Sequence, residues 1–282
     1  LLLMLNSNTF RPDSGLYHFP YIKILNAEKI ILGLSNIHFR FAHISIIQYV
    51  SAISNNFLFL TNGMLFPTAI IFAAVIINFS SEIYDYVKNR NFNLRFFYLF
   101  FTLIFIFYKM NRYSEYGNDI PSHLLFFFLI SELLNFKKYT YNIKKICNLF
   151  IFSSFIFLNK ITLGIACILP FCFINKKNFF NLFKIKRTYF GMLFLILWFF
   201  KNILVSGCLI YPISNTCLTK LSWTDIEEVK EISNQNEAWA KSFPDQKKIL
   251  SYEKFNSEFN WIKSWIKNYL MQLINIFYPY IV

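Results

Sequence analysis

Long apolar runs separated by short basic clusters dominate this chain. Residues 96–108 and residues 188–200 contain no charged side chain. A helix on the surface of a soluble protein keeps polar residues on one face at the helical period, whereas these runs are apolar on every side. Such runs are typical of helices whose solvent is lipid. The pattern therefore predicts an all-α, polytopic integral membrane protein.

The expected elements follow from hydropathy and from the positions of the basic clusters. We expect about seven or eight membrane helices, joined by an amphipathic first external loop and by one external segment near the C-terminus. Residues 1–5 would end a first helix, and residues 268–282 would begin a further one, so we expect the sequence to be part of a longer chain. The remaining expected elements are the first external loop at residues 6–60, with a moderately apolar helix at 44–60, and spans at residues 62–86, 96–112, 123–136 and 188–205.

Residues 146–175 allow two interpretations, because Lys160 lies near their centre. One helix of this length would run roughly 45 Å, against a hydrocarbon core of about 30 Å. It would also bury Lys160, at a cost of about 2.5–3.5 kcal/mol. A hairpin instead places Lys160 at a turn, although each arm is then short. We favour the hairpin, since it brings the basic cluster at residues 176–187 to the same side as the two earlier clusters.

Charge asymmetry orients the expected helices. The three proposed inner loops carry twelve basic residues, whereas residues 220–263 carry seven basic and eight acidic residues. Basic loops face the cytosol in membrane proteins. This places residues 1–205 in a membrane domain with residues 206–267 outside it, and it predicts a plasma membrane protein.

Composition and net charge change this picture little. The chain is 56% hydrophobic and has 37 Phe and 17 Tyr, against about 45–50% apolar residues in an average soluble domain. The net charge of +13 can indicate nucleic-acid binding. The basic residues lie in short blocks between apolar runs, however, with no basic groove interleaved with stacking aromatic side chains. We therefore expect no nucleic-acid partner.

The first external loop contains Asp13, His18 and Arg40 within a short stretch. A carboxylate held beside a bound substrate can act as a general base or as a metal ligand. The alternative for Asp13 is a turn or helix cap, because Pro-Asp-Ser-Gly is typical turn chemistry. His18 can bind substrate, or it can pack at the membrane interface with ordinary hydrogen bonds.

A second external loop places Glu115, Asp119 and His123 on the same predicted side as Asp13. Two loops that converge on acidic residues would suit a base-assisted or metal-assisted transfer. Asp119 can equally be a cap, since it precedes an expected helix. A solvated loop without a catalytic role is the plainer alternative.

Cations at the outer ends of the apolar runs have two possible roles. Lys160, Lys201 and Arg40 can extend to the lipid headgroups, which is the usual role of such side chains. They can also bind a lipid-linked phosphate and stabilise it as a leaving group.

Of the five cysteines, Cys208 and Cys217 are expected outside the membrane, on either side of a proline turn. An oxidising outer compartment would allow a disulfide between them, and two free thiols are the alternative. No cysteine or histidine spacing matches a zinc site. The cofactor is unknown from the sequence, with a divalent cation as one alternative.

Four segments carry a resemblance to a known family. DSGLYHFP (residues 13–20) and GLSNIHFRF (residues 33–41) resemble the first external loop of a bacterial branch of the GT-C membrane glycosyltransferases, and SGCLIYP (residues 206–212) and the Asn260–Trp261 pair are similar to that branch too. The resemblance implies a multi-helix enzyme that takes a sugar from a polyprenyl-phosphate donor at the outer face, for a glycan or lipid acceptor. It implies that Asp13 is the general base or positions the acceptor, with Glu115 or Asp119 as a second acid and Lys160 and Lys201 on the donor phosphate.

The sequence thus predicts a glycosyltransferase of cell-surface glycan or polysaccharide biosynthesis. Two other classes stay open, namely a polysaccharide polymerase or lipid-linked sugar transporter and a non-catalytic membrane subunit. A transporter needs a polar residue within the membrane, for which Glu132 is the candidate.

Overall fold

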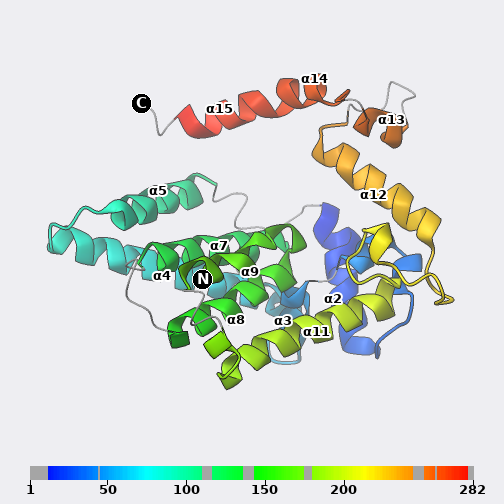
Figure 1. Cartoon of the computed structure of the whole chain (residues 1–282), viewed down its shortest axis with the longest axis horizontal. Helices are drawn as coiled ribbons and strands as arrows, with labels where there is room; N and C mark the ends of the chain where they lie inside the picture. The colour runs from blue at the N-terminus through cyan, green and yellow to red at the C-terminus, as the bar shows by residue number, and fades with distance from the viewer. Residues whose placement is uncertain are drawn as a thin grey trace. The chain divides into compact units, whose positions relative to one another are not determined.

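The computed structural model describes residues 12–43, 45–109, 116–135, 143–174, 180–243, 251–257 and 259–278 (Figure 1). Their regular structure is helical, with twelve α-helices joined by short 3₁₀- and π-helical turns. The all-α prediction is therefore confirmed for these ranges. The expected first helix at residues 1–5 and the candidate Glu115 lie outside the described residues.

The chain divides into two compact units. Unit 1 contains Leu1–Ile31 and His43–Lys201, and unit 2 contains Leu32–Ala42 and Asn202–Val282. The helices that begin in unit 1 are α2 (Phe19–Ala27), α3 (Ile46–Ser54), α4 (Phe66–Lys88), α5 (Leu94–Tyr108), α7 (Asp119–Leu134), α8 (Ile143–Asn159), α9 (Ile165–Ile168) and α11 (Lys186–Ser206).

Four of these helices, α4, α5, α7 and α8, pack side by side in alternating directions. One core cluster joins Phe79 of α4 to Leu99 of α5 and Leu124 of α7. A second cluster joins Leu129 of α7 to Ile156 of α8. All five side chains are fully buried, and close van der Waals packing of such side chains holds helices together in water and in lipid alike.

The chain reverses direction at Lys160, as the hairpin interpretation predicts. The Cys167 thiol lies 3.5 Å from the Ser153 carbonyl oxygen, and the rings of Phe171 and Phe150 are 5.2 Å apart. Pairs whose sequence numbers converge on 160 define an antiparallel return along α8. Residues 161–173 form the short turns η5 (Ile161–Leu163) and η6 (Leu169–Phe173) on either side of α9.

Helix α11 runs in the same direction as α8. Near its start, the Arg187 guanidinium donates to Asn148 Oδ1 at 2.9 Å. Eleven residues later, Trp198 lies 5.4 Å from Phe157 between ring centroids. The C-terminal part of α11 therefore reaches the end of the helix group at which Lys160 lies.

The two ends of the helix group differ in their charged residues. We call one the Arg95 end, where α4 and α7 finish and α5 and α8 begin, and the other the Lys160 end. The turn between α4 and α5 and the start of α11, which contribute basic residues, both lie at the Arg95 end. The predicted grouping of the inner loops on one side thus agrees with the helix directions.

Two helices of the described ranges are long and apolar enough to cross a membrane. They are residues Asn62–Lys88, which includes α4, and Lys186–Ser206, which is α11. At ~1.5 Å per residue they measure roughly 40 and 31 Å, against a hydrocarbon core of about 30 Å. Leu94–Tyr108 and Ile161–Phe173 are apolar but shorter.

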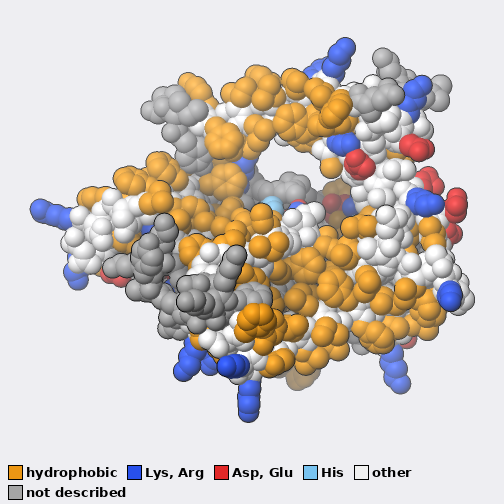
Figure 2. Space-filling model, viewed as in Figure 1, with side chains coloured by type: hydrophobic (Ala, Val, Ile, Leu, Met, Phe, Trp, Pro, Cys, Tyr) orange, Lys and Arg blue, Asp and Glu red, His pale blue; other side chains and the backbone are white. Residues whose placement is uncertain are grey.

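Large apolar side chains cover much of the surface in the view of Figure 2. Helix α11 exposes Phe190, Leu193, Leu197 and Phe200. Soluble monomers rarely expose contiguous apolar patches of more than a few hundred Å². Together with the two long helices, this surface is weak evidence that the chain associates with a membrane.

Unit 2 is built around the segment that follows α11. Its described helices and turns are η2 (Leu34–Asn36), η3 (Phe39–Ala42), η7 (Ser214–Thr216), α12 (Ile226–Ala240), α13 (Tyr252–Asn256), α14 (Ile262–Trp265), η8 (Ile266–Leu270) and α15 (Met271–Phe277). Gly33 has φ +64°, and a Cβ there would lie 2.6 Å from Trp223 Cβ. Only glycine fits this close approach without strain.

Candidate functional site

The polar residues with the best-defined geometry lie at the Lys160 end of unit 1. Lys160 Nζ lies 2.6 Å from Asp119 Oδ1, and the two side chains are 27% and 42% exposed. An ion pair with this exposure contributes about 0–1 kcal/mol to stability. Asp119 is the first residue of α7 and Lys160 follows the last residue of α8, so packing of these two helices brings the charges together.

His123 lies one turn beyond Asp119 on α7. Its side chain is partly buried. Asp119 and Lys160, two predicted site residues from separate segments, are paired, and the imidazole of His123 lies one helical turn from the carboxylate. This combination can bind a phosphate and exchange a proton.

A chain of buried hydrogen bonds lies beside this cluster. Ser45 Oγ and the Ile47 amide both donate to Asn159 Oδ1, at 3.2 and 2.9 Å. The Ser45 amide donates to Gln48 Oε1 at 3.2 Å, and Gln48 Nε2 lies 3.2 Å from His18 Nδ1. The chain runs from the first loop, through the start of α3, to the residue that precedes Lys160.

Tyr116 connects the two expected external loops. Its hydroxyl donates to Ser51 Oγ at 3.1 Å, while its carbonyl oxygen accepts from Ser14 Oγ at 3.4 Å. The ring of Tyr116 also lies 5.6 Å from the imidazole of His18. Ser14 and His18 therefore lie beside Tyr116, the first described residue of the second loop.

Lys201 reaches the Lys160 end from the last turns of α11. Its ammonium lies 4.7 Å from the centre of the Tyr49 ring, a cation–π geometry. The Tyr49 hydroxyl is 3.2 Å from the Tyr21 hydroxyl. Burial raises the pKa of Tyr49 to about 12, although the hydrogen bond with Tyr21 opposes this. The phenol therefore stays protonated at neutral pH and can donate a hydrogen bond.

Asp13 lies at the edge of this region. It precedes the turn η1 (Ser14–His18), is helical in conformation and forms no side-chain capping bond. Its side chain is exposed, while the next residue, Ser14, is buried. The sequence Pro-Asp-Ser-Gly, which is typical of a turn, therefore adopts a helical conformation here.

Arg40 belongs to unit 2. Its guanidinium lies 5.0 Å from the centre of the Phe39 ring. Burial raises the pKa of Tyr211, with a further increase from the charge of Glu228, and the charge of Arg40 opposes both. Arg40 thus lies near Phe39 and Tyr211 of unit 2, whereas Asp119 and Lys160 belong to unit 1.

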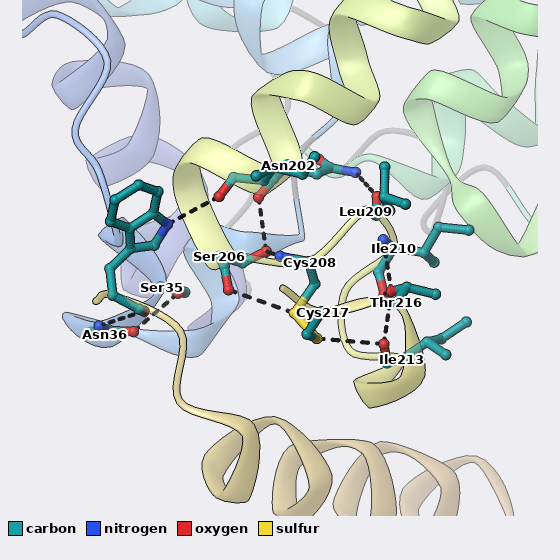
Figure 3. The surroundings of a disulfide bond; sticks show 12 residues. Ser35, Asn36, Asn202, Ser206, Cys208, Leu209, Ile210, Ile213, Thr216 and Cys217 are labelled. Atoms are coloured by element: carbon teal, nitrogen blue, oxygen red, sulfur yellow. Dashed lines mark hydrogen bonds between the residues drawn. A yellow bond between two sulfur atoms is a disulfide. The ribbon is translucent and has the colours of Figure 1, made fainter. Parts of the chain in front are cut away.

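Cys208 and Cys217 form a disulfide in unit 2. Figure 3 shows how polar side chains hold the loop around it. Asn202 Nδ2 donates to the Leu209 carbonyl oxygen at 2.9 Å, and Thr216 Oγ1 accepts from the Ile210 amide at 3.1 Å. Of the alternatives for these cysteines, the structure contains the bonded one. In the described ranges, no group of three or more His, Cys, Asp or Glu side chains could hold a metal ion.

A separate charge cluster joins the helices at the Arg95 end. Arg95 Nη2 lies 2.8 Å from Glu82 and 3.0 Å from Glu132, and Lys145 lies 3.1 Å from Glu132. The Arg95 side chain is only 9% exposed. Beside it lies a cavity of about 280 Å³, whose lining residues are Glu82, Asp85, Tyr86, Asn89, Asn91 and Arg95.

The sequence did not single out several residues of the Lys160 end. Gln48, Tyr49 and Asn159 lie in segments that the hydropathy pattern indicates are apolar, and Tyr116 lies in the second external loop, where the acidic residues stand out instead. One signal was readable, because Ser45 followed three residues later by Gln48 is a capping box, and the structure forms it at the start of α3. The hydrogen bonds that join these residues to distant parts of the chain, such as the one from Ser45 to Asn159, leave no pattern in the local sequence.

The whole chain, residues 1–282, matches a protein family described as a domain of unknown function (DUF8201). No curated protein and no solved structure matches the chain. The family description assigns no activity, so the function is inferred from the chemistry of the residues.

Proposed function

The chain belongs to this family of unknown function, and we propose that it is a membrane glycosyltransferase. In this proposal it moves a sugar from a polyprenyl-phosphate donor to a glycan or lipid acceptor at the outer face of a bacterial inner membrane. One observation carries the proposal: Asp119 and Lys160 form an ion pair at the end of the helix group that lies opposite the basic turns, with His123 one helical turn away on α7.

The proposed membrane arrangement has seven or eight spans, as expected from hydropathy. Helices α4 and α11 support it by length, and the aromatic outer face of α5 supports it by exposure. Helices α5 and α7 have 15 and 16 residues, or roughly 22–24 Å at ~1.5 Å per residue. We therefore expect the bilayer to thin locally around them.

The proposed reaction is an attack on the anomeric carbon of the donor sugar. The acceptor hydroxyl oxygen forms a bond to this carbon. At the same time the bond between the anomeric carbon and the phosphate oxygen of the donor breaks, and polyprenyl phosphate leaves. The proton of the acceptor passes to a carboxylate, either Asp13 or Asp119. Lys160 and Lys201 would balance the charge of the leaving phosphate.

The ion pair fits this chemistry. A donor phosphate would compete with Asp119 for the ammonium of Lys160, which lies 2.6 Å away. Once Lys160 turns to the phosphate, the Asp119 carboxylate is available to accept a proton. Binding of the donor would thus prepare the base.

The experiment is a transfer assay with the purified full chain in lipid nanodiscs. A panel of radiolabelled polyprenyl-phosphate sugars serves as donor, and lipid and glycan extracts of a bacterial envelope serve as acceptors. Lys160→Gln should lower transfer by about 10²–10³-fold, the range for a lost electrostatic stabiliser of the transition state. Asp119→Asn should lower it by about 10²–10⁴-fold if Asp119 is the base, the range for a lost acid–base group. Asp13→Asn, in the same assay, decides which carboxylate is the base.

A matched control comes from unit 2, where Lys241 pairs with Glu237. Glu237→Gln removes a carboxylate from an equally simple ion pair and should keep full transfer. Thermal midpoints of all variants separate lost chemistry from lost folding. Absence of transfer with every donor, by a folded wild-type chain, would remove the enzyme proposal.

The other function classes predict different assay results. A transporter would move the lipid-linked sugar and leave the glycosyl–phosphate bond intact, a polymerase would lengthen a glycan, and a non-catalytic subunit would do neither. Glu132, the candidate polar residue for a transporter, lies in ion pairs with Arg95 and Lys145. No described contact favours these classes over transfer.

A further inference from the structure

The last described helical segment of unit 2 has two chemically different faces. Helix α14, the π-turn η8 and helix α15 follow one another without a break and have four, five and seven residues. Figure 1 shows them as one rod, roughly 24 Å long at ~1.5 Å per residue. Its side chains recur at helical spacing, so residues three or four apart share a face.

One face of the rod is polar and contacts Ser242, which follows α12 in the same unit. Ser264 Oγ donates to the Ser242 carbonyl oxygen, and Asn268 Nδ2 donates to Ser242 Oγ at 2.6 Å. Gln272 and Asn275 continue the same face at helical spacing. These contacts fix the rotation of the rod, because its polar side is turned toward the end of α12.

The opposite face is apolar and exposed. Its members are spaced by three or four residues and are 38–58% exposed: Ile262, Ile266, Leu270, Leu273 and Phe277. Trp265 and Tyr269, whose rings lie 6.2 Å apart, border it. We call these seven side chains the apolar arc. Hydrophobic side chains are visible along this rod in Figure 2.

Two basic residues complete the pattern. Lys263 and Lys267 are one turn apart and exposed, and their aliphatic stems can lie along apolar surface while the ammonium groups reach outward. Met271 and Ile274, 58% and 48% exposed, follow the two lysines at helical spacing and widen the apolar surface. Apolar residues over most of the rod, amides on one side and lysines on its flank are typical of helices that lie in a membrane interface. Tryptophan and tyrosine favour the same depth.

We propose that residues 262–277 form an interfacial helix that lies in the plane of an anionic bilayer surface. The apolar arc enters the boundary between headgroups and acyl chains, and Lys263 and Lys267 contact lipid phosphates. A spanning helix needs about 20 predominantly apolar residues. This rod would instead carry its polar face through the hydrocarbon.

This inference is an alternative to the expectation that residues 268–282 begin a further span, and the experiment below separates the two. It rests on the membrane placement of the chain and is independent of sugar transfer. It also gives unit 2 a second attachment to the bilayer besides the end of α11.

Depth measurement tests the proposal with the full chain in vesicles of phosphatidylcholine and phosphatidylglycerol. The free cysteines Cys147, Cys167 and Cys172 are replaced by alanine, and one new cysteine at a time carries an environment-sensitive fluorophore. Ile266→Cys, Leu270→Cys, Leu273→Cys and Phe277→Cys sample the apolar arc, and Ser264→Cys, Asn268→Cys and Asn275→Cys sample the polar face.

Labels on the apolar arc should all be quenched to a similar extent by lipids that carry a shallow nitroxide, and labels on the polar face should not. A quenching depth that increases steadily from residue 264 to residue 277 would overturn the proposal in favour of a span. Shielding of the arc from both lipid and aqueous quenchers would overturn it in favour of contact with protein, either this chain or a second copy.

The lysines provide an independent test. Shallow quenching at Leu270→Cys should increase at least twofold when phosphatidylglycerol is added. In the Lys263→Gln/Lys267→Gln double variant this increase should disappear, whereas Lys220→Gln/Lys230→Gln, with the same loss of charge elsewhere in unit 2, should retain it. Equal responses of the two double variants would remove the role of the lysines. None of these readouts depends on sugar transfer, so failure of the enzyme proposal is distinguished from failure of this one.

Discussion

Among single residues, Gln48 sets the chemistry of its neighbour His18. Gln48 Oε1 accepts from the Ser45 amide, so the other end of the same amide, Nε2, faces His18 Nδ1. An amide nitrogen only donates, and Nδ1 must therefore be the acceptor. The imidazole is then neutral and carries its proton on Nε2. His18 is thus arranged as a hydrogen-bond donor through Nε2.

The first prediction concerns this buried amide. Gln48→Leu should destabilise unit 1 by about 1–3 kcal/mol, because it leaves the Ser45 amide and His18 Nδ1 without their partner in a buried site. Thermal unfolding of the purified protein, followed by tryptophan fluorescence, measures the change. Gln272→Leu, at an exposed position of α15, is the control and should leave the midpoint nearly unchanged. An unchanged midpoint for Gln48→Leu would mean that the hydrogen bonds contribute nothing net.

Sequence reasoning reached only part of this residue-scale chemistry. Asp119, Lys160 and His123 could be selected, because charged residues are conspicuous beside apolar runs. Asn159 could not, because a neutral amide inside an apolar segment has no distinctive pattern, and for Gln48 only the capping box with Ser45 is readable. The partner of Asn159, Ser45, is more than 100 residues away, and the partner of Gln48 across the fold, His18, lies in the preceding loop. Such pairings require the tertiary fold.

Among the helices, ion pairs fasten the Arg95 end of the group. Arg95 of α5 bridges Glu82 of α4 and Glu132 of α7, and Lys145 of α8 adds a fourth helix. Arg95 is buried, whereas the Lys145 side chain is 36% exposed. The cost of losing one member of such a cluster depends on how far the remaining charges are removed from water.

The second prediction is a contrast between these two cations. Arg95→Met should destabilise the protein by about 3–5 kcal/mol, because Glu82 loses the arginine in a poorly hydrated site and Glu132 keeps only Lys145. Lys145→Met should cost about 0–1 kcal/mol, since its pair is partly exposed. Thermal midpoints in the same detergent measure both. Equal losses for the two variants would contradict this account of the cluster.

A compensated variant sharpens the contrast. Glu82→Gln/Arg95→Met/Glu132→Gln removes all three charges together and should recover most of the lost stability, because a buried ion cluster replaced as a whole is often close to neutral. A triple variant as unstable as Arg95→Met alone would indicate that packing of the arginine side chain, and not its charge, is what matters.

Helix positions followed from the sequence better than helix ends did. The expected spans at residues 62–86 and 188–205 agree with α4 and α11 within a few residues, because long uniform apolar runs leave little choice. The segment from residue 206 to residue 267 was expected to be hydrophilic throughout, whereas a helix begins at Ile262. Apolar residues spaced between lysines and amides lower the average hydropathy and conceal an amphipathic helix.

For the whole molecule, the distribution of charge between the two ends of the helix group is the main organising feature. Parity of the apolar runs and the positive-inside rule predicted that the basic turns lie together, and the directions of α4, α5, α7, α8 and α11 agree. The hairpin at Lys160 was necessary for this result. A single long helix would have placed the start of α11 at the opposite end.

The last prediction is the sidedness of the chain in a bacterial inner membrane. In a background without the three free cysteines, Asn91→Cys lies in the exposed turn between α4 and α5, and Lys220→Cys lies in unit 2. We expect an impermeant maleimide applied to the outside of spheroplasts to label position 220 and not position 91. Permeabilised cells should label at both, which shows that each cysteine can react.

This outcome follows from the energetics of membrane insertion, because basic residues close to helix ends are retained on the cytosolic side. The turn between α4 and α5 and the start of α11 carry such residues, and unit 2 is nearly neutral. Positions 91 and 220 lie on opposite sides only if the chain crosses the membrane an odd number of times between them. Labelling of both from the same side would mean an even number of crossings. Asp119 and Lys160 would then no longer be assigned to the face where a lipid-linked sugar is presented, and the transfer chemistry would lose its substrate.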